Sequence, residues 1–231
     1  MRQTLLRTLR RGWFAIREQI FLSRHGARAE RFGAIYRDRM WQNPETASGF
    51  GSTLAATGQL RRGLNDFFRR NDIASWLDAP CGDANWQPHV RFSGRYTGID
   101  IVPDMIAANR ERIDRSGWQF EVRDIVSDAL PAADLVLCRE CMNHLPLDDG
   151  VRALANLERA AGKFLLVTDY PQCRDNAQQP ASFRYRPLNL TLAPFGLRTP
   201  DAWIDEDDHE PGKRIAIWRL DAGPLRAQGT A

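Results

Sequence analysis

Short apolar runs alternate with longer segments of helical periodicity between residues 72 and 170, and this alternation restricts the possible folds more than any other feature of the chain. Apolar runs bounded by Pro, Gly or Ser are typical of strands buried on both faces, as in parallel sheets. The expected strands are Ala74–Leu77, Arg95–Ile99, Gln119–Val122, Leu135–Cys138 and Phe164–Thr168. Two segments between them, Met105–Ile113 and Asp148–Ala160, predict helices because Pro or Asp residues stand at their beginnings. An α/β fold with a parallel sheet is therefore expected.

Two further apolar segments follow a long Pro-rich passage that begins after Pro171. They are Trp203–Asp205 and Ile215–Leu220, and they flank the turn-like sequence DDHEPGK. Two short strands around such a turn predict an antiparallel hairpin. The complete expectation is a mostly parallel, seven-stranded sheet that ends in this C-terminal hairpin.

The chain has 231 residues, which is enough for one domain with an appendage. Residues 1–40 are expected to form a basic helical arm, because residues 1–39 hold ten arginines against three acidic residues, a balance of +7. Apolar residues recur in the arm at helical spacing, namely Leu5, Leu9, Trp13, Ile16 and Ile20. The main domain is expected at residues 41–221, with residues 41–71 as an N-terminal lid and helix. Residues 222–231 are expected to be disordered.

Two interpretations of the basic amphipathic arm are open. Residues 1–22 would contact an anionic membrane surface or another polyanion, or the apolar stripe would pack on the domain or on a second subunit, which is the favoured interpretation. The chain has no apolar run of the roughly 18 residues that a membrane span requires, no secretory h-region, and four cysteines without disulfide spacing. We expect a soluble cytoplasmic protein with free thiols, peripheral at the inner membrane surface under the first interpretation. The sequence does not indicate its oligomeric state.

Three acidic residues end three successive strands of the expected sheet. Ligands of an open parallel sheet bind beyond the carboxyl ends of its strands, so Asp78, Asp100 and Asp124 are candidate binding residues. Asp100 follows Asp78 by 22 residues, which suits an acid that accepts both hydroxyls of a ribose. Asp124 is placed to bind an exocyclic adenine amine, and Ile101 and Ile125 are able to flank the ring. These positions predict a nucleoside-containing cofactor.

The turn after the first strand indicates which nucleoside cofactor the site takes. Pro80, Gly82 and Asp83 predict a tight bend before the next helix, and Gly82 allows close approach of a ligand to the backbone. A nicotinamide dinucleotide enzyme would need a G-x-G-x-x-G turn that holds a pyrophosphate at a helix N-terminus. Asp78 and Asp83 would repel a pyrophosphate. S-adenosylmethionine has no phosphate and presents an ammonium and a sulfonium group, so electrostatics favour it over NAD.

Five segments together carry a resemblance to a known family: SGFGS, DAPCGDANW, TGIDIVPDMI, DLVLCRECMNHLP and PLNLTLAPFGL. They resemble a bacterial group of class I S-adenosylmethionine-dependent methyltransferases over roughly residues 41–220, with DAPCGD in place of the glycine-rich first motif. Pro80 and Ala84 stand where that motif has its first and third glycines. The resemblance implies a Rossmann-like fold, with Asp78, Gly82 and Asp83 at the methionine moiety. It also implies Asp100 at the ribose, Asp124 at the adenine and a backbone contact from Cys138.

Several patterns that resemble other chemistries are incomplete. Pro80-Cys81 follows the first strand, whereas the nucleophile of cytosine-C5 methyltransferases should follow the fourth. Cys138 and Cys141 have C-x-x-C spacing without a second cysteine pair or paired histidines, so no metal is expected. No nucleic-acid partner is expected either, because no complete motif of amino-methylating nucleic-acid enzymes is present.

The expected reaction is methyl transfer from S-adenosylmethionine to an oxygen, or a nitrogen, of a small molecule or glycan. His144, in the segment CRECMNHLP after the fourth strand, is the candidate base, because an unperturbed imidazole titrates near pH 6.5. Arg139 or Glu140 would orient the acceptor. The alternative for His144 is that it packs beside the cofactor and caps the next helix. Alternative functions are a catalytically silent binding module recruited through the arm and, less favoured, an NAD-dependent oxidoreductase.

Overall fold

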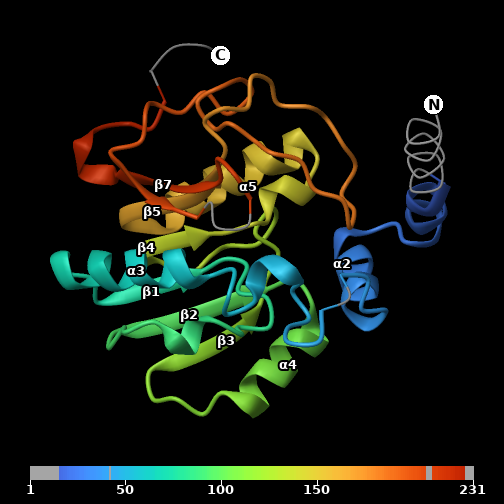
Figure 1. Ribbon diagram of the computed structural model, residues 1–231, viewed down its shortest axis with the longest axis horizontal. Coiled ribbons are helices and arrows are strands. Elements are labelled where there is room, and N and C mark those ends of the chain that lie inside the picture. The colour runs from blue at the N-terminus through green and yellow to red at the C-terminus, as the bar shows by residue number, and fades with distance from the viewer. Residues whose placement is uncertain (1–15, 42, 207–209, 227–231) are drawn as a thin grey trace.

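The computed structural model describes residues 16–41, 43–206 and 210–226 and contains a seven-stranded sheet with the order β3-β2-β1-β4-β5-β7-β6 (Figure 1). The strands are β1 (Ser75–Asp78), β2 (Arg95–Asp100), β3 (Trp118–Val122), β4 (Ala133–Cys138), β5 (Ala161–Asp169), β6 (Ala202–Asp205) and β7 (Arg214–Arg219). Neighbouring strands from β3 to β5 are parallel, and β7 is antiparallel to both β5 and β6. The predicted fold, with its C-terminal hairpin, is confirmed.

The α-helices with described bounds are α2 (Arg28–Arg37), α3 (Gly58–Arg70), α4 (Pro103–Arg112) and α5 (Leu147–Ala160). Successive side chains of strand β1 point to opposite faces of the sheet. Trp76 packs in the cluster that includes Leu60 and Leu64 of α3. Leu77 belongs to the opposite cluster, with Leu154 of α5. The sheet therefore lies between two layers, and a buried leucine truncated to alanine in either layer costs on the order of 2–5 kcal/mol.

The prediction of a helix directly after the first bend is wrong. Between β1 and β2, where every residue is described, the chain makes only the single 3-10 turn Gln87–His89. Pro88 lacks the N–H that an extending helix would need. Trp86, Val90 and Phe92 are buried and fill the space against the sheet that a helix would otherwise cover. The first turn thus offers no α-helix N-terminus to a ligand.

The described part of the N-terminal region packs on the domain. Residues 16–24 are helical, and α2 stands beyond the carboxyl ends of the strands (Figure 1). Phe21 and Ile35 are buried, and the ring of Phe21 meets that of Phe183 edge to face at a centroid distance of 5.4 Å. The rest of the predicted arm, residues 1–15, and the end of the predicted tail, residues 227–231, lie outside the described residues. None of the described helices is long and apolar enough to cross a membrane.

Candidate functional site

One cavity of about 500 Å³ opens at the carboxyl ends of the parallel strands, where an open sheet of this kind binds its ligand. Nine of the predicted site residues line it: Pro80, Gly82, Asp100, Ile101, Asp124, Ile125, Arg139, Glu140 and His144. The other three, Asp78, Asp83 and Cys138, are not among the described residues that line it. The cavity joins the expected cofactor residues to the expected catalytic residues.

Asp100 is held at the end of β2 by two backbone donors. The N–H of Gly82 lies 3.2 Å from Oδ2 and that of Val102 lies 3.0 Å from Oδ1. Each carboxylate oxygen keeps a second lone pair, so the group can also accept two hydroxyl hydrogens from a ribose. Burial raises the pKa of Asp100 to about 6. Gly82 is required here for a second reason, because its φ is +57° and a Cβ would collide with Ser48 Oγ.

Asp78 does not reach the cavity. Its side chain is buried, and Oδ2 accepts hydrogen bonds from Gln87 Nε2 at 2.7 Å and from the Tyr96 hydroxyl at 2.9 Å. Burial raises the pKa of Asp78 to about 7. The carboxylate therefore supports the turn after β1 from behind, and any influence on a ligand is electrostatic.

Asp83 holds the segment that covers the cavity. Its carboxylate accepts hydrogen bonds from Thr46 Oγ1 at 2.8 Å, from the backbone N–H of Ala47 at 2.7 Å and from Ser48 Oγ at 2.9 Å. Residues 48–52, which directly follow these contacts, all line the cavity. Asp83 thus fastens the lid segment, residues 46–52, to the turn after β1.

Asp124 lies at the cavity wall and pairs with Arg28, a residue that the sequence analysis missed. Arg28 of α2 lies 2.6 Å from Asp124 Oδ2 and 2.8 Å from Asp149 Oδ2. Asp124 Oδ1 accepts the N–H of Val126 at 2.9 Å. The ion pairs fix α2 over the end of β3, so α2 is part of the cavity wall.

His144 is oriented by a backbone carbonyl. Its Nδ1 lies 2.8 Å from the carbonyl oxygen of Arg184, which can only accept, so Nδ1 donates and the neutral ring keeps its lone pair on Nε2. Burial lowers the pKa of His144, although the nearby Arg184 carbonyl and Glu140 oppose the shift. The ring lies against Trp41, with 5.3 Å between centroids. At neutral pH His144 is therefore an uncharged base.

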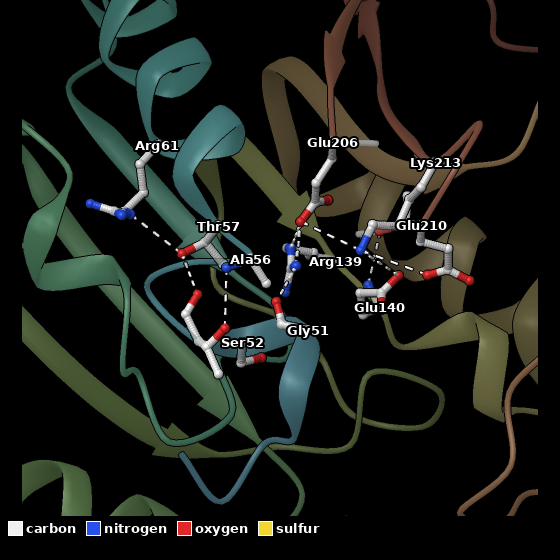
Figure 2. Close-up of polar contacts among 12 residues, drawn as sticks. Gly51, Ser52, Ala56, Thr57, Arg61, Arg139, Glu140, Glu206, Glu210 and Lys213 are labelled. Carbon is white, nitrogen blue, oxygen red and sulfur yellow. Dashed lines mark hydrogen bonds and ion pairs between the residues drawn. The ribbon is translucent and has the colours of Figure 1, made fainter. Parts of the chain in front are cut away.

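Arg139 is tied to two other segments of the chain. Its Nε donates to Glu206 Oε1 at 2.8 Å, and its guanidinium also donates to the Gly51 carbonyl oxygen at 2.6 Å (Figure 2). Both charged side chains are almost fully buried. Arg139 thus connects β4, the lid segment and the end of β6, and its predicted role toward an acceptor competes with these contacts.

Glu140 has an unusual backbone conformation, with φ of +52°. A non-glycine residue in this region costs on the order of 1–3 kcal/mol, and such outliers gather at functional sites. The N–H of Glu140 donates to Thr168 Oγ1 at 2.9 Å, and Oε1 lies 3.4 Å from the Tyr170 hydroxyl that donates to it. These contacts hold the carboxylate at the cavity wall.

The sequence analysis missed further polar residues at the cavity, because they lie far along the chain from the strands that carry the predicted site. Lys213 and Glu210 lie between β6 and β7, and Tyr185 lies in the Pro-rich passage. The Tyr185 hydroxyl donates to Glu210 Oε1, and Lys213 Nζ lies 3.7 Å from Glu140 Oε1. The only available sequence signal was the charged turn DDHEPGK, which fixes a hairpin but not the cavity that it faces.

The geometry suits S-adenosylmethionine better than a dinucleotide. Asp100 keeps acceptor capacity toward the cavity, Gly82 leaves no room for a side chain, and the turn after β1 has no helix N-terminus for a pyrophosphate. The residues present therefore fit the sulfonium cofactor. Within the described residues no group of His, Cys, Asp and Glu side chains is arranged to hold a metal ion.

Comparisons with known proteins agree with this geometry. The methyltransferase domain family matches residues 77–162. Magnesium protoporphyrin IX methyltransferase from Synechocystis, with bound S-adenosylmethionine, has a TM-score of 0.57 at 14% identity over 81% of this chain and 92% of that one. N-methyltransferase NodS from Bradyrhizobium japonicum, in complex with S-adenosylhomocysteine, has a TM-score of 0.57 at 14% identity over 80% and 97%. A DhpI complex with S-adenosylhomocysteine has a TM-score of 0.55 at 18% identity over 80% and 96%. No curated protein sequence matches the chain.

Residues 77–162 thus match a methyltransferase domain, and the chain shares the fold of these S-adenosylmethionine-dependent methyltransferases. Both findings agree with the expectation of a methyltransferase that uses S-adenosylmethionine.

Proposed function

We propose that this chain is an enzyme that transfers a methyl group from S-adenosylmethionine to an oxygen or nitrogen atom of a small molecule or glycan. The observation that carries the proposal is the single cavity that extends from Asp100 to His144. The Asp100 carboxylate, proposed to bind the cofactor, and the uncharged His144 imidazole thus line the same cavity. Volumes of roughly 300–1,000 Å³ are usual for small-molecule sites.

The cofactor end of the cavity is assigned by hydrogen-bonding capacity. Asp100 would accept the ribose hydroxyls, and Ile101 and Ile125 would flank the adenine. Asp124 would accept the adenine amine while it remains paired with Arg28. Gly82 and Pro80 would lie along the methionine moiety. When bound, the cofactor supplies a methyl group on a sulfonium centre, which makes the methyl carbon electrophilic.

His144 would remove the proton that the acceptor atom loses as its bond to the methyl carbon forms. The Nδ1–H donated to Arg184 leaves Nε2 as the accepting atom, and the lowered pKa keeps the ring uncharged at neutral pH. The lid segment and α2 would keep water out, which strengthens electrostatic interactions within the cavity. The base and the closed site are the contributions of this chain to the rate.

The walls of the cavity favour a small acceptor over a macromolecule. Trp41, Phe50 and Phe183 line it together with Tyr185, and the lid segment closes one side. A base in a nucleic-acid duplex would have to be extruded to reach the bottom of a cavity of this kind. A small molecule, or one residue of a glycan, fits without such a rearrangement.

The test uses S-adenosylmethionine labelled in its methyl group, incubated with the purified enzyme and the small-molecule fraction of a cell extract. We expect label in a compound of low molecular mass, and we expect Asp100→Ala to lose most of the transfer. A matched control, Glu158→Ala, removes a carboxylate that pairs with Arg226 outside the cavity lining. Label found only in macromolecules, or only in the donor, would contradict the proposal.

A further inference from the structure

The turn between β6 and β7 brings charge to the end of the cavity that holds Glu140. Glu206 follows β6 and Lys213 precedes β7, with Glu210 between them. Figure 2 shows the Lys213 side chain among Glu206, Glu140 and Glu210, with Arg139 on the other side of Glu206. The ammonium nitrogen lies 3.7 Å from Glu140 Oε1, 3.7 Å from Glu206 Oε1 and 3.8 Å from Glu210 Oε2.

The charges in this group do not balance. Arg139 and Glu206 neutralise each other, and their side chains are only 4% and 1% exposed. Lys213 then remains as one cation for two carboxylates, those of Glu140 and Glu210. Among the described residues of the group, one negative charge is therefore left without a cation.

The exposures decide which sign of charge a ligand meets. The Lys213 side chain is 4% exposed, whereas those of Glu140 and Glu210 are each 26% exposed. Both glutamates line the cavity, and the hydroxyl of Tyr185 fixes Glu210 by donating to Oε1. An anionic ligand would face two partly exposed carboxylates, while a cation would complete the pairing.

The neighbouring wall is aromatic. Trp41, Phe50, Phe183 and Tyr185 line the same cavity and offer apolar area beside the two carboxylates. Aromatic faces also attract ammonium groups, because the ring quadrupole places negative charge on the face. We propose that the acceptor is a small amine, whose ammonium group lies between Glu140 and Glu210 and whose apolar body packs on this wall. This inference rests on the proposed function and names the substrate class of the same site.

The ammonium group of the cofactor itself is the competing occupant. If Glu140 and Glu210 held the methionine moiety, replacing them would weaken binding of S-adenosylhomocysteine, which keeps that moiety. If they hold the acceptor, the affinity of each variant for S-adenosylhomocysteine should stay within about twofold of the wild-type value. This measurement also shows that each variant is folded.

The experiment titrates three probes of similar size into the enzyme saturated with S-adenosylhomocysteine: 2-phenylethylamine, 2-phenylethanol and 3-phenylpropanoate. Calorimetry or protein-observed NMR gives each dissociation constant. We expect the amine to bind at least tenfold more tightly than the alcohol and the carboxylate to bind most weakly. Glu140→Gln and Glu210→Gln should each reduce the preference for the amine about tenfold, whereas the control Glu158→Gln should leave it unchanged.

Two results would overturn the proposal. One is an amine that binds no more tightly than the alcohol or the carboxylate, or shows no measurable binding. The other is a loss of S-adenosylhomocysteine affinity in Glu140→Gln and Glu210→Gln, which would assign both carboxylates to the cofactor. Failure of the amine proposal is distinguishable from failure of the proposed function, because label transfer to an uncharged small molecule would still support the latter.

Discussion

The Asp83 carboxylate accepts hydrogen bonds from the side chain and the backbone of the segment that covers the cavity, and its contact with Thr46 Oγ1 is 2.8 Å long. Thr46 is buried although its hydroxyl is polar, which the charge-assisted hydrogen bond to Asp83 compensates. Asp83, which was expected to touch the cofactor but does not line the cavity, therefore fastens the lid segment over it.

Loosening this contact should weaken cofactor binding. Asp83→Ala removes the acceptor for three donors of the lid segment. We expect affinity for S-adenosylhomocysteine to fall about tenfold, or ~1.4 kcal/mol, mainly through faster dissociation. Calorimetry and stopped-flow displacement measure both quantities. Thr46→Val, which removes one donor and keeps the carboxylate, should show a smaller effect in the same direction. Asp66→Ala on α3, outside the cavity lining, is the control. If Asp83→Ala bound S-adenosylhomocysteine as tightly as this control, the contact between Asp83 and the lid segment would have no role in cofactor binding.

Cofactor affinity should depend on pH through Asp100. Burial raises its pKa to about 6, so the ligand-free protein is stabilised by protonation at low pH, and that stabilisation is lost as pH rises through 6. Ribose hydroxyls donate to the ionised carboxylate, so binding favours loss of the proton. Affinity for S-adenosylhomocysteine should thus be constant well above pH 6 and fall by up to about tenfold per pH unit below it.

The matched variant is Asp100→Asn, which cannot ionise in this range. Its affinity should be lower at neutral pH, by roughly 1.5–3 kcal/mol for the loss of charge-assisted hydrogen bonds, and nearly independent of pH between 5 and 8. Calorimetry in buffers of different ionisation enthalpy detects the released proton directly. Identical pH profiles for wild type and variant would show that another group controls binding.

Turnover should depend on an uncharged His144. Because burial lowers its pKa below the ordinary value of 6.5, kcat should be constant at neutral pH and decline as the ring gains a proton in more acidic solution. His144→Gln should reduce kcat roughly a hundredfold with little change in cofactor affinity. His89→Gln, at an exposed histidine in the turn after β1, is the control. Turnover of His144→Gln close to that of wild type would limit His144 to packing beside Trp41.

Local sequence patterns predicted the strands and the acidic residues that end them, because both depend on residues that are close together in the sequence. Alternation of buried faces fixes where β1 and β2 run, and parallel strands bring their carboxyl ends to one edge whatever covers them. The predicted helix after β1 failed for a tertiary reason. Pro88 interrupts the segment, and Trp86 and Phe92 are buried against the sheet in an irregular layer.

The residues that complete the site were invisible because nothing local distinguishes them. Arg28 meets Asp124 across 96 positions of sequence, and in the sequence it was one of ten arginines in a basic region. Lys213 and Glu210 belong to a turn whose charges resemble those of any solvated hairpin. Only the antiparallel pairing of β7 with β5 places that turn beside β4 and the cavity.

The buried ion pair of Arg139 and Glu206 gives the last prediction, which concerns stability. Glu206→Gln would leave the guanidinium buried with its principal anion removed, because the carbonyl of Gly51 is a neutral acceptor. Breaking one side of such a pair costs about 3–5 kcal/mol of the free energy of unfolding, whereas replacing both partners by apolar residues is often nearly neutral. We therefore expect Glu206→Gln to be much less stable than the double variant Arg139→Met/Glu206→Leu in urea unfolding. The half-buried pair of Glu158 and Arg226, which is far more accessible to solvent, supplies the comparison, since Glu158→Gln should cost no more than about 1 kcal/mol. If Glu206→Gln proved as mild as Glu158→Gln, the contact between β4 and the end of β6 would not depend on this ion pair, and Arg139 would be free to turn toward an acceptor.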